Sequence, residues 1–186
     1  MHLDLPKSLQ NTCSLLVKIK KVILIVSSLI LAFTFLAVVV LRYFFEADLF
    51  AYEEWILIVA FWMYFMGGAL GSYENSHIKA DFLATILKTA RARWLLINFT
   101  FLIEFIVCAV LSYWAFLMVF EEISSYPGWQ RTSALQLPFF IPRLGIFLGF
   151  LLMTFYCAMH LLSGLRMGPT VEWEEEETPF IAEEDR

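Results

Sequence analysis

The sequence predicts an all-α integral membrane protein with four transmembrane helices. Of its 186 residues, 60% are apolar and only 17% are charged, whereas soluble domains are nearer half apolar and a quarter charged. The excess lies in four apolar runs of 19 to 27 residues: Val22–Leu41, Trp55–Tyr73, Trp94–Phe120 and Leu144–Ser163. A bilayer core of about 30 Å needs about 20 helical residues to cross it. Each run is therefore long enough to span a membrane, and this composition excludes a soluble enzyme.

The predicted spans cover residues 22–44, 53–73, 94–121 and 140–164 and form one membrane domain over residues 1–170. Lys and Arg residues set the orientation of such a domain, because acidic residues contribute little. Nine of them lie in the N-terminal tail, in the connection between the second and third spans, and directly after the fourth span. Only three lie in the other two connections. We therefore expect both termini and the middle connection to be cytoplasmic.

Charged residues mark the junction between the first two spans. Arg42 ends the first span, and Glu53 and Glu54 open the second. Each charge suits the local helix dipole, so all three are explained as ordinary helix-end charges. Alternatively, Arg42 and one glutamate hold this corner together or bind another subunit.

Small residues at four-residue spacing predict close helix contacts. Gly67 and Gly71 form one such pair in the second span, and Gly145 and Gly149 form another in the fourth. Small side chains let helix backbones approach closely where lipid provides no hydrophobic driving force.

The connection between the second and third spans predicts a short amphipathic helix over residues 81–92. Its apolar side chains fall on one face, and Asp81 can act as the N-cap. Basic residues late in this segment suit both the helix dipole and anionic headgroups. We expect this helix to lie on the cytoplasmic membrane surface.

Glu104 is the most unusual residue of the third span, because it lies about 15 Å into the run, near the bilayer midplane. A carboxylate there costs a few kcal/mol, so it should face protein or be protonated. One hypothesis is a proton or cation relay, and the other is a polar contact with a neighbouring helix. A relay usually needs several ionisable groups in series, and no other run supplies one at that depth. The contact hypothesis is therefore favoured.

Nothing in the sequence predicts an enzyme, a cofactor or a metal site. A bis-histidine haem needs two facing histidines, and of His2, His77 and His160 only the last lies in a span. The sequence has no CxxC, P-loop, GxSxG or HExxH motif. Residues 171–186 contain eight acidic residues and one basic residue, which favours a disordered, solvated tail.

Taken in order, four short segments resemble the small membrane subunit of tripartite ATP-independent periplasmic (TRAP) transporters. They are Arg42-Tyr-Phe-Phe, Tyr52-Glu-Glu-Trp55, Gly67-Gly-Ala-Leu-Gly71 and His77-Ile-Lys-Ala-Asp81. The resemblance is specific over residues 42–83, and elsewhere it depends on length, four spans and topology. Glu104 and the acidic tail lie outside the family pattern.

The resemblance implies a non-catalytic subunit in a bacterial inner membrane. It would form a heterodimer with a large membrane subunit that moves organic anions with sodium, and would brace the scaffold of that subunit. A periplasmic substrate-binding protein and phospholipid would be further partners, with no role for nucleic acid. The substrate would be a C4-dicarboxylate, a keto acid or sialic acid. His77 and Asp81 would then be structural, as would Arg42, Glu53 and Glu54. The alternative is a stand-alone, proton-coupled four-helix exporter that uses Glu104.

Overall fold

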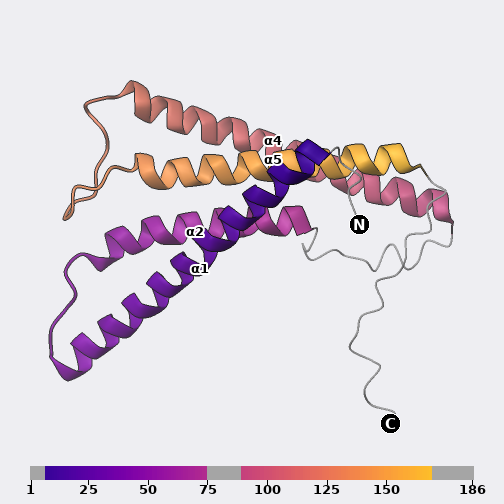
Figure 1. Cartoon of the computed structure of the whole chain (residues 1–186). Coiled ribbons are helices and arrows are strands. Elements are labelled where there is room, and N and C mark those ends of the chain that lie inside the picture. Colours follow the sequence, from indigo (N-terminus) through magenta and orange to yellow (C-terminus); the bar gives the residue numbers. More distant parts are fainter. Residues whose placement is uncertain (1–6, 75–88, 169–186) are drawn as a thin grey trace, which may run out of the picture.

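The structure, a computed structural model, describes residues 7–74 and 89–168, and this part of the chain is almost entirely helical (Figure 1). Its helices are α1 (Lys7–Phe44), α2 (Tyr52–Glu74), α4 (Ala90–Ser124) and α5 (Phe140–Met167). Each of them contains a segment that is long and apolar enough to cross a membrane. The prediction of an all-α protein with four long apolar helices is therefore confirmed.

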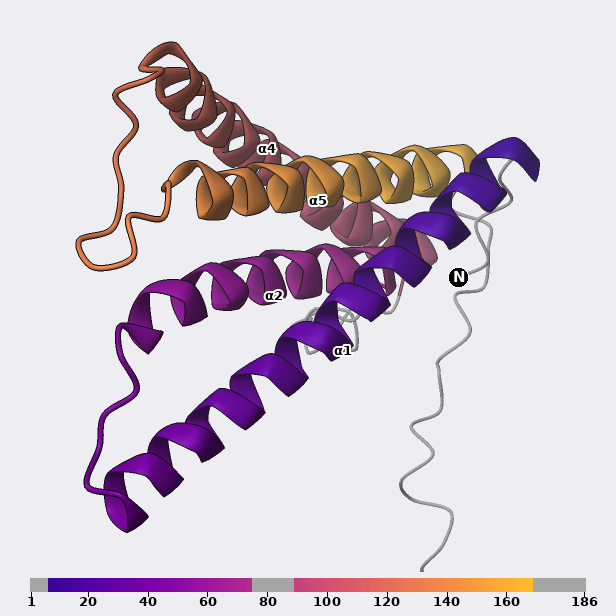
Figure 2. The ribbon, with the colours of Figure 1, turned by 60° about the vertical axis from the view of Figure 1, so that its left-hand side comes forward.

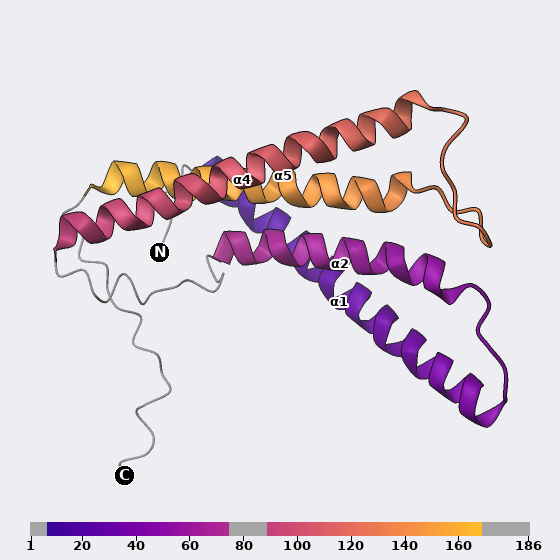
Figure 3. The same cartoon turned by 180° about the vertical axis from the view of Figure 1, so that it is seen from behind.

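The helices form two hairpins that meet along α2 and α5. Residues 45–51 join α1 to α2, and residues 125–139 join α4 to α5. The extensive interfaces are those of α1 with α2, α2 with α5, and α5 with α4, and Figure 3 shows α2 and α5 in the centre. We call the end of the bundle with these two connections the loop end. The opposite end, where α1 begins and α5 ends, is the terminal end.

The helices differ greatly in length. α1 has 38 residues and α2 has 23, so at 1.5 Å per residue they are about 57 and 35 Å long. α1 crosses α2 obliquely and diverges from it toward the loop end, as Figure 2 shows. Large apolar side chains such as Phe33 and Trp114 are exposed on the outer faces of α1 and α4. Such faces suit contact with lipid rather than with water.

Some predicted features fall outside the described residues. These are most of the interfacial helix predicted over residues 81–92, the acidic tail 171–186, and both His77 and Asp81. In the described part of the middle connection, residues 90–92 are the first turn of α4. The helix α4 therefore begins four residues before the span predicted from Trp94.

Candidate functional site

Polar side chains gather in two groups, one toward each end of the bundle. The terminal-end cluster consists of Lys20, Ser72, Glu104, Cys157 and His160. The loop-end cluster consists of Glu54, Glu122, Gln130 and Arg143. Between them, α2 and α5 contact each other mainly through apolar side chains, and the indole N–H of Trp62 in α2 donates a hydrogen bond of 3.2 Å to the Ile141 carbonyl in α5.

Lys20 of α1 is buried in the terminal-end cluster, with a relative exposure of 1%. Its ammonium group donates a hydrogen bond of 3.2 Å to the carbonyl of Ala69 in α2. It also lies 4.1 Å from the ring centroid of Tyr156 and 5.6 Å from that of Tyr73. The C-terminal end of a helix carries a partial negative charge, and aromatic faces attract cations. Both effects stabilise the lysine where α1 crosses the end of α2.

Ser72 connects three helices at the same level. Its hydroxyl donates to Oε1 of Glu104 in α4 at 3.5 Å and lies 3.4 Å from the sulfur of Cys157 in α5. Glu104 is therefore in contact with a neighbouring helix, and it is partly buried. Other polar residues of α4 lie four and eight residues from Glu104. Ser112 is buried, whereas Thr100 is exposed and its hydroxyl donates to the Leu96 carbonyl of its own helix.

His160 of α5 is the last member of the terminal-end cluster and contacts both α2 and α4. Its Nε2 atom lies 3.2 Å from the carbonyl oxygen of Tyr73, and its ring stacks on that of Phe101 with centroids 5.6 Å apart. The Tyr73 carbonyl is among the last four of α2, which lack intrahelical partners. His160 therefore lies at a helix end that needs a polar partner.

These contacts bring ionisable groups of two other helices, Lys20 and His160, near Glu104 at the terminal end of the bundle. Ser72 contacts Glu104, and the adjacent Tyr73 is close to both Lys20 and His160. Lys20 precedes the first apolar run in the sequence, but it reaches this cluster because α1 is slanted and its early turns reach α5 (Figure 1).

We expect Lys20→Ala to lower the free energy of unfolding by about 2 kcal/mol, because it removes a charged hydrogen bond and a cation–π contact. Lys21→Ala is a matched control, since Lys21 forms an exposed ion pair with Glu74 at 3.3 Å. Such surface pairs contribute about 0.5 kcal/mol or less. Thermal unfolding in detergent measures both variants, and equal losses for the two lysines would contradict the assignment.

At the loop end, Glu122 and Arg143 form an ion pair between the end of α4 and the start of α5. The Glu122 side chain is only 3% exposed. Its Oε1 atom accepts a hydrogen bond of 3.1 Å from the backbone amide of Gln130, and Arg143 donates one of 2.8 Å to the Gln130 side chain. This closed ring of polar contacts holds the first part of the 125–139 connection against both helices.

Glu54 connects the same segment to α2. Its carboxylate accepts hydrogen bonds from the backbone amides of Ala134 at 2.8 Å and Leu135 at 2.7 Å. Arg42 is exposed at the end of α1, and Glu53 is exposed beside Glu54. Within the described residues, Glu54 is therefore bound by the 125–139 connection rather than by Arg42. The sequence carries no signal for this contact, because backbone amides have no residue-specific pattern.

We expect Glu54→Ala to speed hydrogen exchange at the amides of Ala134 and Leu135 by about tenfold, because both lose a charge-assisted hydrogen bond. Glu53→Ala is the matched control and should leave these two amides protected. Exchange followed by mass spectrometry measures the peptide that contains them. Unchanged protection in Glu54→Ala would show that the carboxylate does not hold this segment.

The predicted small-residue pairs lie at different interfaces. A Cβ atom added at Gly149 would lie 2.5 Å from the Cβ atom of Phe65 and 3.0 Å from its carbonyl oxygen, so this glycine sets the approach of α5 to α2. One added at Gly145 would lie 3.2 Å from the ring of Trp62. At Gly67, the nearest atom would be Cδ2 of Leu24 in α1, at an ordinary 3.4 Å. Gly71 is partly buried in α2.

The arrangement therefore holds all four helices together at the terminal end, and α2, α4 and α5 together at the loop end. Its charged groups bind helix ends and connections. Comparison with known proteins identifies the family of the chain. The model of the family described as "Tripartite ATP-independent periplasmic transporters, DctQ component" matches residues 30–167, which is more than half of the chain. No curated protein matches the sequence. The match confirms the resemblance found in the sequence: the chain belongs to the DctQ family, the small membrane component of TRAP transporters.

Proposed function

We propose that the chain is a non-catalytic scaffold subunit that braces the large membrane subunit of a sodium-coupled TRAP transporter. Membership of the family makes it a small TRAP component and implies a large membrane subunit and a substrate-binding protein as partners in general. We further propose that the two membrane subunits form a heterodimer and that transport is coupled to sodium.

The observation that carries the scaffold role is the apolar contact between the two polar clusters. Phe65 of α2 lies 5.1 Å from Phe150 of α5, centroid to centroid, and Met66 is buried beside it. Gly149 brings the two backbones together at the same level. A carboxylate substrate crossing the bundle would lose its hydration there without gaining polar partners among the described residues, which is energetically costly. The apolar contact therefore favours a structural role for this chain and a transport path that lies in another subunit.

In this proposal the loop end faces the periplasm, and both termini are in the cytoplasm of a bacterium. The imbalance of Lys and Arg supports this orientation. Arg42, Glu53, Gly71, His77 and Asp81 are then structural residues that order the ends of α2. Glu104 acts as a polar contact between helices, which its hydrogen bond from Ser72 supports.

The transported substrate is proposed to be an organic anion: a C4-dicarboxylate, a keto acid or sialic acid. Residues that select among these anions, and the sodium sites, would belong to the large subunit and the binding protein. The small subunit would contact phospholipid with its exposed apolar faces.

The test is to purify the tagged chain from its native membrane in mild detergent and identify the accompanying proteins by mass spectrometry. We expect a large polytopic membrane protein in about equal amount. A homo-oligomer without such a partner would overturn the proposal. In the same complex, Glu104→Gln should leave transport largely intact, because the amide can still bond Ser72. Loss of transport with normal assembly would assign Glu104 a direct role in transport.

A further inference from the structure

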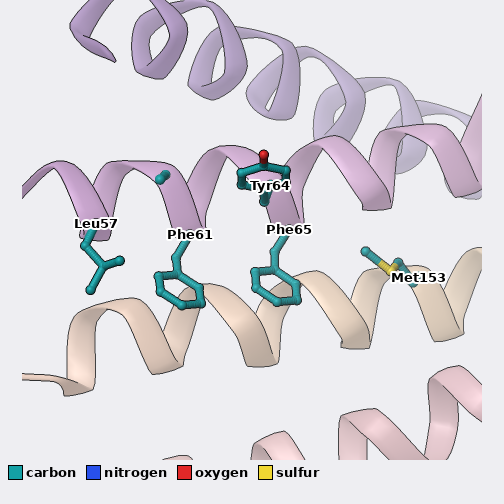
Figure 4. A pocket seen from close by; sticks show the side chains of 6 residues that line it. Leu57, Phe61, Tyr64, Phe65 and Met153 are labelled. Atoms are coloured by element: carbon teal, nitrogen blue, oxygen red, sulfur yellow. The ribbon is translucent and has the colours of Figure 1, made fainter. Parts of the chain in front are cut away.

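Two hollows lie next to each other along α2 and share Leu57 as a lining residue. The first is an apolar groove of about 460 Å³ between α2 and α5, shown in Figure 4. Its lining residues are Leu57, Ala60, Phe61, Tyr64, Phe65 and Met153. Apart from the exposed Tyr64, it offers hydrocarbon surface only.

The second hollow, of about 320 Å³, lies at the loop end, between the first turn of α2 and the 125–139 connection. Its polar side chains are those of Glu53, Glu54, Arg131, Thr132 and Ser133, and Leu57 again forms part of its wall. Of the two carboxylates, that of Glu54 is already bound by backbone amides of the connection. The two hollows therefore give one path that is polar and charged at the loop end and apolar beyond it.

We propose that this path binds one phospholipid whose headgroup carries a phosphodiester and a primary ammonium group. The headgroup lies in the polar hollow, and one acyl chain follows the groove between α2 and α5. The lipid site requires only that the bundle is in a bilayer. A failed test of this site would therefore leave the proposed transport role unaffected.

Charge complementarity selects this occupant. Arg131 supplies a cation for the phosphodiester, and guanidinium groups bind phosphate oxygens well. The exposed Glu53 supplies an anion for the ammonium group, whereas Glu54 already accepts hydrogen bonds from Ala134 and Leu135. An apolar helix of another subunit would fill the groove but would leave Arg131 and Glu53 without partners of opposite charge. An anionic glycerol headgroup would leave Glu53 without a cation.

The test measures lipid binding by native mass spectrometry on the full chain with the subunits that accompany it. The protein is exchanged into detergent micelles containing equal amounts of phosphatidylethanolamine and phosphatidylglycerol. We expect about tenfold more bound phosphatidylethanolamine, the factor that one charge-assisted contact provides. Glu53→Gln should remove this preference, and Arg131→Gln should weaken binding of both lipids.

Two controls separate a specific site from general effects of substitution. Ala60→Phe fills the groove and should abolish binding, whereas Val110→Phe places the same aromatic ring on the exposed face of α4 and should not. Glu121→Gln, at an exposed carboxylate at the loop end, should preserve the preference. Equal binding of both lipids by the unmodified chain would overturn the proposal. So would a photo-crosslinker at position 60 that attaches to a partner protein rather than to lipid.

Discussion

Arg143→Met is expected to lower the free energy of unfolding in detergent by about 3 kcal/mol, the usual cost of removing one partner from a buried ion pair. The cost arises because Glu122 is only 3% exposed and would keep its charge without the guanidinium group. The same substitution also removes the hydrogen bond from Arg143 to Gln130. Thermal unfolding followed by tryptophan fluorescence measures the loss, since Trp129 and Phe140 stack nearby with centroids 5.8 Å apart.

The control for this prediction is Glu121→Gln, which changes an exposed carboxylate one residue away and should shift stability little. The double variant Glu122→Leu with Arg143→Met removes both charges and should recover much of the loss, because an apolar pair can replace a buried ion pair at little cost. If Arg143→Met were no less stable than Glu121→Gln, the ion pair would not hold the loop end together.

The second large effect is expected at Gly149. Gly149→Ala should lower the free energy of unfolding by about 1–3 kcal/mol, the usual cost of overpacking a tight contact. The added methyl group would meet backbone atoms of Phe65 at 3.0 and 3.2 Å as well as its Cβ atom. Backbone atoms cannot rotate away as a side chain can, so α2 and α5 must separate. Chemical or thermal unfolding in detergent measures the change.

Gly67→Ala provides the matched control in the partner helix. Its added methyl group would meet only the end of the Leu24 side chain, at 3.4 Å. Alanine also favours the helix over glycine by up to about 1 kcal/mol. Gly67→Ala should therefore be neutral or slightly stabilising. A loss equal to that of Gly149→Ala would show that the α2–α5 contact is not the tight one.

The number and nature of the helices could be predicted because the bilayer imposes a minimum length of apolar sequence. The runs at residues 22–41 and 144–163 exceed anything a small soluble domain would carry. Their exact ends could not be predicted in this way. α1 begins at Lys7 and α4 at Ala90, within polar sequence, because backbone hydrogen bonds continue a helix beyond its apolar part.

The polar contacts were predicted less completely. Glu104 stood out because a carboxylate is expensive in an apolar run, and a contact with a neighbouring helix was the favoured expectation. Lys20 was counted only as a charge that sets orientation, since its burial depends on where α1 crosses α2. The bonds of Glu54 to Ala134 and Leu135 depend on how a connection folds back over α2. Neither the burial of Lys20 nor the hydrogen bonds of Glu54 produce a periodic pattern in the sequence.

The order of contacts in the bundle has a consequence for biosynthesis. The α1–α2 hairpin is made first, but the main partner of α2 in the other hairpin is α5, the last of the four described helices to leave the ribosome. Until about residue 167 has been inserted, the face of α2 with Phe65 must therefore remain against lipid or an insertion factor. A chain stalled before residue 140 would lack α5, so the face of α2 that packs against Gly149 would have no partner helix. If this stalled chain is degraded early, the completion of α5 is the step that makes the helix bundle stable.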